Sequence, residues 1–338
     1  MSVLSRLQSL NIKLCPDLSQ SDCVIFRPAP GSSPALTASV TQESVKSGLQ
    51  RANVKLRSDL SQIDCCIFQH TSVSSPASPA LVTQANPLVS CLMVTRGNIA
   101  LMRYSLVCYE RQTYANRELV VVAEPQAGEK VRAFIAAQES INATVLVAPP
   151  GLTLGEHRNL AAVHARGAIL VNWDDDDLSD PRRLDTSVQV LRQTGAAAAF
   201  LARVLVWWPQ RKVAAISSRR FWEQSIAVWR NYAPSYAALP IDEDLVAINR
   251  LISTHPVARV DSPFLYVYVV TGRNTSDASH FEGILSTAKC IFEGDQFDEL
   301  NEHLSDHLPV LDYATLLKDE AAKSLLGWRM SLAGSRCP

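Results

Sequence analysis

The sequence lacks the features that mark secreted and membrane-spanning proteins. None of its eight cysteines forms a CxxC pair, and residues 1–14 contain no continuous apolar stretch of the kind found in secretory signals. No run reaches the roughly 18 apolar residues needed to cross a bilayer, and the closest, residues 196–208, is interrupted by Arg203. These absences predict a cytoplasmic protein with free thiols, which would meet lipid-linked material only from the membrane surface.

An excess of one charge is also lacking. The formal net charge is −1 and the isoelectric point is near 6.7, so no global field would attract nucleic acid or an anionic membrane. A charged partner must therefore be recognised locally, and we expect no nucleic-acid partner. What the chain does have is 338 residues, 47% of them hydrophobic. That is enough to bury a large core in one or two globular domains.

The first eighty-odd residues contain an internal duplication. Residues 7–26 recur as residues 49–68, a constant offset of 42, and 13 of the 20 aligned positions are identical. Each copy, about 5–35 and 47–77, ends in a Pro/Ser-rich segment typical of loops. Each also holds two short apolar runs that predict brief strands, at 11–14 and 23–26 and again at 53–56 and 65–68.

We therefore expect residues 1–85 to form a small β-containing module. Two interpretations of the duplication stay open. It is either a packing or oligomerisation element without chemistry, through which the chain would form a homo-oligomer, or a docking site for a partner or acceptor.

From residue 86 the pattern changes to apolar runs that alternate with helical stretches. This alternation predicts an α/β fold with a mainly parallel central sheet flanked by helices. Residues 281–338 are expected to form a helical extension that covers the sheet. The predicted strands lie near 88–94, 118–123, 144–148, 168–173, 200–208, 212–217 and 257–270, and the predicted helices near 98–112, 128–139, 156–166, 181–193 and 242–253.

Four consecutive carboxylates, Asp174–Asp177, follow the apolar strand predicted at 168–173. Neighbouring like charges repel and raise one another's pKa, unless a cation is present. A hard ion such as Mg²⁺ or Mn²⁺ takes oxygen ligands from one or two carboxylates and from substrate phosphates. In α/β sheets, ligands bind beyond the carboxyl ends of the strands, which is where this run falls. The run therefore indicates a divalent metal site, and the alternative is a solvated acidic turn or a helix N-cap.

Five separated blocks within residues 88–280 together resemble the inverting glycosyltransferases of family 2, which have the GT-A fold. They are residues 88–95, 109–114, 118–122, 154–167 with an Arg-Asn pair, and the acidic run in the D-x-D-D form of the bacterial metal motif. The resemblance implies a GT-A nucleotide-sugar-binding domain over 86–280. It further implies a Mn²⁺- or Mg²⁺-dependent glycosyltransferase of the hexosyltransferase type.

Such an enzyme would transfer a sugar from a nucleotide-diphospho-sugar, with a UDP-linked donor favoured, to an acceptor hydroxyl. The acceptor would be a glycan, lipid-linked or protein acceptor, for example in bacterial surface-glycan biosynthesis. Asp176 is the expected direct metal ligand, and Asp174 is expected at the nucleotide ribose or the metal's water shell. Alternation along a strand or tight turn would make these two side chains converge.

The resemblance implies donor contacts for Thr95, Asp175 and the pair Arg158-Asn159. A guanidinium binds a diphosphate in bidentate fashion, which suits Arg158 to this role. The alternative is a surface arginine paired with Glu156.

Other positions around these blocks depart from the family pattern or have no place in it. Members commonly end the second strand in Asp-Asp, but this chain has Glu124 there, which is the expected substitute contact to the donor. Residues 266–275 resemble a related bacterial Y-x-Y-V-x-H-x-x-N-T sequence without its metal-binding histidine, and His280 is the expected replacement. His157 and His164, seven residues apart, are expected to be structural or exposed.

Inverting transfer also needs a carboxylate that takes the proton of the acceptor hydroxyl. Residues 239–245 resemble the family's E-D motif at a helix start, which implies Asp244 as the base, Glu243 as a second acceptor contact and Asp242 as the fallback base. The alternative is that these carboxylates only complement the helix dipole.

Aromatic residues that would either stack on acceptor sugars or pack in the core are Trp207, Trp208, Trp222, Trp229, Tyr232 and Tyr236.

Two other functions fit parts of this pattern. A sugar-1-phosphate nucleotidyltransferase also uses an α/β sheet and acidic metal ligands, but residues 94–98 are too poor in glycine and basic residues for its phosphate loop. A non-catalytic nucleotide-sugar-binding protein of the same fold would explain the departures from the family pattern.

Overall fold

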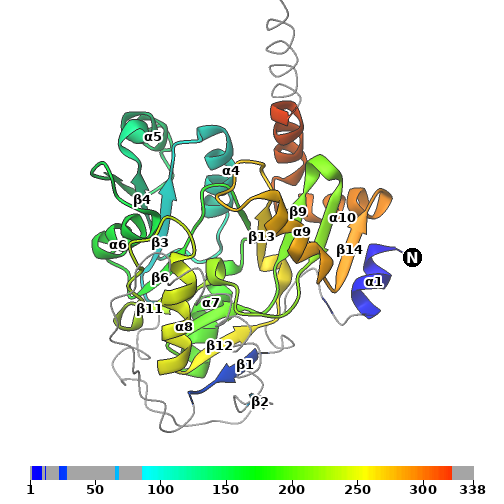
Figure 1. Cartoon of the computed structure of the whole chain (residues 1–338), viewed down its shortest axis with the longest axis horizontal. Helices are drawn as coiled ribbons and strands as arrows, with labels where there is room; N and C mark the ends of the chain where they lie inside the picture. Colours follow the sequence, from blue (N-terminus) through cyan, green and yellow to red (C-terminus); the bar gives the residue numbers. More distant parts are fainter. Residues whose placement is uncertain (1, 10–11, 13–22, 29–64, 68–85, 322–338) are drawn as a thin grey trace, which may run out of the picture.

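A computed structural model describes residues 2–9, 12, 23–28, 65–67 and 86–321 of the chain. Within these residues the strands form a nine-stranded sheet, in the order β2-β1-β12-β8-β11-β6-β3-β4-β5, and a five-stranded sheet, in the order β14-β10-β9-β13-β7 (Figure 1). Helices pack on both faces of the larger sheet. The predicted α/β fold, a central sheet flanked by helices, is confirmed.

The parallel half of the nine-stranded sheet coincides with the first four strands predicted after residue 86. β6, β3, β4 and β5 run parallel and are joined by crossover helices. The continuous apolar sequences of β3, β4 and β6 fit strands that are covered on both faces, whereas the edge strand β5 is only partly buried. The elements of this half are β3 (Val89–Thr95), α4 (Ile99–Glu110), β4 (Arg117–Ala123), α5 (Gly128–Ala136), β5 (Ala143–Val147), α6 (Leu154–His164) and β6 (Ile169–Asn172).

The other half of the sheet is mixed. β11 is antiparallel to both β6 and β8, whereas β12 is parallel to β8. β11 is only three residues long and was not predicted, because so short a strand shows no periodicity. The elements here are α7 (Arg183–Thr194), β8 (Ala198–Leu201), β11 (Ala227–Trp229), α8 (Glu243–Thr254) and β12 (Val257–Val260).

The five-stranded sheet lies beside the acidic run. It includes one strand, β14, from the tail that was predicted to be helical, and β14 pairs antiparallel with β10. The rest of the described tail is helical apart from its loops. The elements are β7 (Leu178–Ser179), β9 (Leu205–Trp208), β10 (Val213–Ile216), β13 (Tyr266–Val269), α9 (Ala278–Ser286), β14 (Cys290–Glu293), α10 (Asp295–Ser305) and a helical segment at 310–321.

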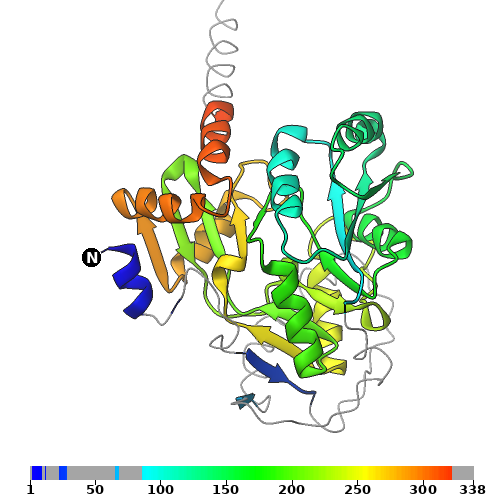
Figure 2. The same cartoon turned by 180° about the vertical axis from the view of Figure 1, so that it is seen from behind.

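Alternate residues of β4 face two different helix layers. Leu119 and Val121 belong to an apolar cluster with α4, α5 and α7, whereas Val120 and Val122 belong to a cluster with α6 and α8. The two opposite views show this arrangement, with α8 in front of the sheet in Figure 1 and α7 in front of it in Figure 2. The layer with α6 and α8 matters for function, because both helices begin at the candidate site.

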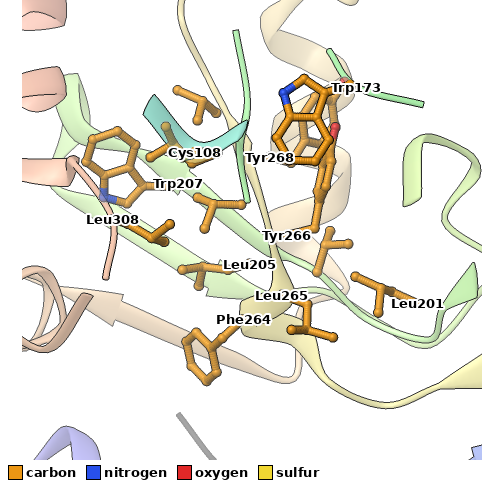
Figure 3. Close-up of a cluster of buried hydrophobic side chains, with 14 of the residues drawn as sticks. Cys108, Trp173, Leu201, Leu205, Trp207, Phe264, Leu265, Tyr266, Tyr268 and Leu308 are labelled. Carbon is orange, nitrogen blue, oxygen red and sulfur yellow. The ribbon is translucent and has the colours of Figure 1, made fainter. Parts of the chain in front are cut away.

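A second part of the core fills the space around the five-stranded sheet. Trp207 is fully buried there and its Nε1 donates a hydrogen bond of 2.9 Å to Asn301 Oδ1. Figure 3 shows Trp207 with Leu205, Phe264 and Leu308 in this cluster. Tyr266, in the same view, has a ring buried in this core. This core therefore fixes β13, the strand from which Tyr266 extends.

The described parts of residues 1–85 pack against the rest of the chain. β1 (Cys23–Phe26) pairs with β12 on one side and with β2 (Cys65–Ile67) on the other, so the predicted Cys-initiated strands of the two copies pair with each other. Helix α1 (Val3–Ser9) packs on α10. The strands predicted at 53–56 and, apart from Ile12, at 11–14 lie outside the described residues.

Candidate functional site

A cavity of about 700 Å³ lies at the carboxyl ends of β3, β4 and β6. Its wall brings together segments far apart in the sequence, namely the ends of these strands, the starts of α6 and α8, and the loop after β13. Most residues predicted for the site line it, which are Thr95, Glu124, Arg158, Asp174, Asp175, Asp176, Glu243, Asp244 and His280.

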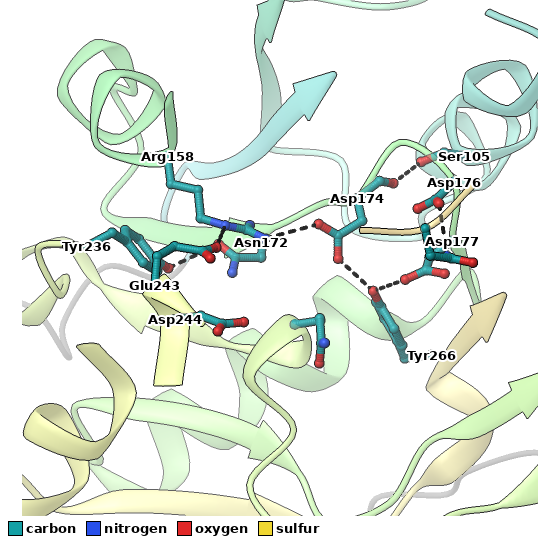
Figure 4. Close-up of polar contacts among 12 residues, drawn as sticks. Ser105, Arg158, Asn172, Asp174, Asp176, Asp177, Tyr236, Glu243, Asp244 and Tyr266 are labelled. Atoms are coloured by element: carbon teal, nitrogen blue, oxygen red, sulfur yellow. Dashed lines mark hydrogen bonds and ion pairs between the residues drawn. The ribbon is translucent and has the colours of Figure 1, made fainter. Parts of the chain in front are cut away.

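The carboxylates of the acidic run do not all share the same hydrogen-bond partners. Tyr266, from β13, donates its hydroxyl hydrogen bond to both Asp174, at 2.8 Å, and Asp177 (Figure 4). Asp176 accepts a 3.2 Å bond from Asn274 Nδ2. Asp174 and Asp176 thus have different hydrogen-bond partners, and their convergence on one cation stays a prediction. The strand β6 ends at Asn172 and the chain bends at 175–176, so strand alternation does not extend into the run.

The carboxyl groups of the acidic run are buried close to one another, and this raises the pKa of three of them. Burial raises the pKa of Asp175 to about 6, although a 2.5 Å hydrogen bond from the Thr95 hydroxyl acts to lower it. Burial, followed by the repulsion of the neighbouring carboxylates, raises the pKa of Asp176 well above its usual value. The pKa of Asp177 is also raised by burial and by Asp174, even though the Val269 N–H and the Tyr266 hydroxyl donate to it. A cation in the cavity would relieve this repulsion.

Carboxylate oxygens, the ligands that hard divalent cations prefer, line the cavity. Among the described residues, no group of three His, Cys, Asp or Glu side chains is arranged to hold a metal ion. His280 is therefore not brought together with Asp174 and Asp176 as a third ligand. Carboxylates that line the cavity nevertheless offer one or two oxygen ligands, the number that Mg²⁺ or Mn²⁺ takes when substrate phosphates complete the shell.

Arg158 lies at the centre of the site, between the acidic run and α8. Thr153 and Glu156 form a capping box that starts α6. Glu156 is thereby engaged, so the alternative of an Arg158–Glu156 surface pair is wrong. Arg158 is 11% exposed, and its Nε donates a 2.7 Å bond to Glu243 Oε1. Its Nη2 lies 3.7 Å from Asp174 Oδ1, so one guanidinium links both acidic groups (Figure 4).

The two carboxylates at the start of α8 have different surroundings. Glu243 is buried and held by Arg158, whereas Asp244 receives a 2.8 Å bond from the Leu245 N–H and none from the other residues drawn with it (Figure 4). Burial raises the pKa of both carboxyls, and the positive charge of Arg158 acts in the opposite direction. A carboxylate with a raised pKa is a stronger base, and Asp244 is the one of the two to which Arg158 donates no hydrogen bond.

Three further predicted residues take distinct places. Glu124 lines the cavity and lies 3.5 Å from Arg96 Nε. Asn159 does not line it: its Nδ2 donates to the Tyr236 carbonyl at 2.8 Å, and its Oδ1 accepts from the Tyr236 N–H. His280 lines the cavity, but the charged groups that act on it are Arg220, Asp242 and Asp277 rather than the acidic run.

The aromatic residues before α8 belong to the core rather than to a sugar platform. Trp207, Trp208, Trp222, Trp229 and Tyr236 are buried, and with Tyr232 they are absent from the cavity wall, where Tyr268 is present instead.

Several residues of the site were missed from the sequence. Tyr266 and Asn274 contact the acidic run from a segment about ninety residues away. The one sequence signal for them was that residues 266–275 resemble the bacterial Y-x-Y-V-x-H-x-x-N-T sequence. Arg220 and Glu223 form a 3.3 Å ion pair in the cavity wall. His157, expected to be structural or exposed, is buried and also lines the cavity.

Among the described residues, no helix is both long and apolar enough to cross a membrane. Cys23, Cys91, Cys108 and Cys290 are free thiols, as predicted for these positions.

Comparison with known proteins yields likenesses in structure only. No family model matches the chain, and no curated protein is similar to it. S. aureus TarS 1-349 in complex with UDP-GlcNAc aligns with 64% of this chain and 72% of its own, with 12% identity and a TM-score of 0.47. The mannosyltransferase PcManGT from Pyrobaculum calidifontis, in complex with GDP-Man and Mn²⁺, aligns over 75% and 82%, with 16% identity and a TM-score of 0.45. Likenesses this weak assign no donor, acceptor or metal to this chain.

Proposed function

We propose that the protein is a metal-dependent inverting glycosyltransferase that uses a nucleotide-diphospho-sugar. One observation carries the proposal. A single cavity holds an acidic run at the carboxyl end of β6 on one side and the partly buried carboxylate Asp244 on the other, with Arg158 between them. The first group suits a cation with a diphosphate, and the second suits an acceptor hydroxyl.

The acidic run would hold the donor's diphosphate through a divalent cation. Asp176 and Asp174 are the ligands we propose, with Asp175 and Thr95 beside them. When bound, Mn²⁺ or Mg²⁺ would neutralise the charge that develops on the leaving diphosphate. Arg158 adds a fixed positive charge on the side toward the acceptor. We favour a UDP-linked donor from the sequence resemblance.

Asp244 would act as the base. Its carboxylate takes the proton from the acceptor hydroxyl, whose oxygen attacks the anomeric carbon. The bond from that carbon to the diphosphate oxygen breaks, and its electron pair leaves with the diphosphate. Attack from the face opposite the leaving group inverts the anomeric configuration. Arg158 binds Glu243 at 2.7 Å and leaves the neighbouring Asp244 in the cavity wall, which would keep the base next to the sugar.

Donor binding tests the proposal directly. The purified chain with Mn²⁺ or Mg²⁺ would be titrated with UDP-, GDP-, CMP- and dTDP-sugars, and the shift in melting temperature measured, since a ligand stabilises the folded state that binds it. We expect stabilisation by at least one donor, lost on chelation of the metal. If no sugar nucleotide binds or is hydrolysed, the proposal is wrong. Pyrophosphate release from a nucleoside triphosphate would instead favour a sugar-1-phosphate nucleotidyltransferase. Donor binding without transfer to any acceptor would favour a non-catalytic nucleotide-sugar-binding protein.

Two substitutions separate the proposed roles. Asp176→Ala should abolish metal-dependent donor binding. Asp244→Asn should keep donor binding within about twofold and lower sugar transfer about 10²- to 10⁴-fold, the usual contribution of a general base. Asp298→Asn is the matched control, because Asp298 pairs with Lys212 on the exposed surface, and it should change neither property. Equal loss of binding in both site variants would contradict the two roles.

A further inference from the structure

His157 is a buried imidazole in the wall of the cavity. The residue is 5% exposed and lines the cavity. Its Nε2 has no hydrogen-bond partner among the described residues. A buried polar atom without a partner is destabilising, and in a native structure it calls for an explanation such as a bound ligand. A half-turn of the ring would move the nitrogen to the other ring edge, so the argument concerns the imidazole as a whole.

His157 and Arg158 serve different parts of the same cavity. Neighbouring residues on an α-helix project about 100° apart. Arg158 extends toward Glu243 and Asp174. The carboxylates that act on His157 are Glu124, which follows β4, and Glu156 on its own helix, although burial is the main effect on the ring and lowers its pKa. His157 thus faces the end of the cavity at β4, away from the acidic run.

The order of the strands indicates which part of the donor would lie at the β4 end of the cavity. β4, β3 and β6 are successive neighbours in the sheet, so Glu124, Thr95 and Asp174 follow one another along its edge. With the diphosphate at Asp174 and the base Asp244 beyond it, a nucleoside attached to the diphosphate must extend the other way, toward Glu124. α6, the helix that carries His157, packs against both β3 and β4.

We infer that the His157 imidazole hydrogen-bonds the edge of the donor's nucleobase and helps to select the base. The inference rests on the proposed function. A neutral imidazole offers one donor and one acceptor. Uracil, cytosine and guanine present different donors and acceptors at their edges, so a single buried partner at a fixed position discriminates among them.

The test compares ligands with and without a base. Affinities of the full chain with Mn²⁺ are measured by calorimetry for UDP, CDP, GDP, dTDP and inorganic pyrophosphate. Wild type should bind at least one nucleoside diphosphate more tightly than pyrophosphate. His157→Ala should weaken the best nucleoside diphosphate about tenfold, the usual effect of one hydrogen bond in a buried site, and leave pyrophosphate unchanged. His157→Gln, which keeps a donor and an acceptor, should restore part of the affinity.

His164→Ala is the matched control. His164 lies two turns later on the same helix, is exposed, and has its Nδ1 2.9 Å from the Leu160 carbonyl oxygen. It should bind every ligand as wild type does. If His157→Ala weakens pyrophosphate and the nucleotides equally, or changes neither, the inference is wrong while the proposed function stands. If wild type binds no nucleoside diphosphate, both are wrong.

Discussion

At the scale of single residues, Glu118 shows how a buried carboxylate outside the site helps to hold it in place. Its Oε1 accepts hydrogen bonds from the Ser90 hydroxyl, at 2.7 Å, and from the Arg166 N–H, at 2.6 Å, while its Oε2 accepts from Arg166 Nε. It thereby ties β3 and β4 to the end of α6, the helix that carries Arg158. Burial acts to raise its pKa, but these hydrogen bonds and the charge of Arg166 lower it overall.

We predict that Glu118→Gln lowers the free energy of unfolding at pH 7 by about 2 kcal/mol, because hydrogen bonds to a charged group are lost. The pKa of the Glu118 carboxyl is lower in the folded protein than in the unfolded chain, so its charge stabilises the fold at any pH above the unfolded-state pKa. This stabilisation is lost as the pH falls through the folded-state pKa. The difference between variant and wild type should therefore shrink below about pH 4. Denaturant unfolding at several pH values measures it.

Glu129→Gln is the control for this prediction, because Glu129 is 93% exposed and pairs with Arg132 on the surface. It should unfold like wild type at every pH. A Glu118→Gln effect that stays the same from pH 7 to pH 3 would show that lost packing, rather than the charge, is responsible.

Single residues also show which parts of the site the sequence could reveal. The acidic run was predicted because four carboxylates after an apolar strand are visible in one dimension, whereas Arg158 and the Glu243-Asp244 pair were predicted from the resemblance to the family's motifs. The role of Tyr266 was not. Its hydroxyl reaches Asp174 and Asp177 only because β13 pairs with β7 and β9 in a particular register, and non-local pairing leaves no local signal.

At the scale of elements, the approach of α6 to the loop before α8 depends on Gly155. A Cβ built on Gly155 would lie 1.9 Å from the Ala237 carbonyl oxygen, and its N–H donates a 3.2 Å bond to the Leu239 carbonyl. Backbone meets backbone here, so a side chain cannot be accommodated without separating the two elements. This contact sets the position of Arg158 relative to Glu243 and Asp244.

We predict that Gly155→Ala lowers sugar transfer at least tenfold and the stability by more than about 1 kcal/mol, because overpacking displaces α6 from α8. Gly283→Ala is the matched control, since Gly283 also lies in a helix and a Cβ there meets nothing within 4 Å. It should be neutral or stabilising by up to about 1 kcal/mol. Transfer kinetics and thermal unfolding of both variants measure the contrast. Normal transfer in Gly155→Ala would contradict this role of the contact.

Elements differ in how well a sequence reveals them. β3, β4, β5 and β6 were predicted, since each is an apolar run between helices. β7, β11 and β14 were missed because they are short, do not alternate with helices in the βα pattern, and are held by pairing with neighbours from elsewhere in the chain. The short strands complete the second sheet and the mixed half of the first.

At the scale of the whole molecule, the duplicated region raises the question of domain boundaries. The sequence predicts divisions at 1–85, 86–280 and 281–338, and these stay a proposal. The contacts that residues 1–85 make with the rest of the chain are relevant to the first of these divisions. β1 pairs with β12 over four residues, and Phe26 meets Phe221 with ring centroids 4.9 Å apart. Within α1, the Val3 N–H lies 3.1 Å from the Glu299 carboxylate and Leu7 is buried.

From these contacts we predict that removal of residues 1–85 destabilises the remaining chain rather than freeing an independent enzyme. Deletion would expose Phe221 and leave β12 as an open edge, which promotes aggregation.

A point variant avoids that complication. Leu7→Ala should lower the free energy of unfolding by about 2 to 5 kcal/mol. Leu4→Ala is the control, because Leu4 lies on the same helix but is exposed, and it should have little effect. Calorimetry should show one cooperative transition that shifts in Leu7→Ala. An unchanged main transition in both the deletion and Leu7→Ala would establish residues 1–85 as a separate module, because an independent domain's unfolding does not depend on its neighbour's core.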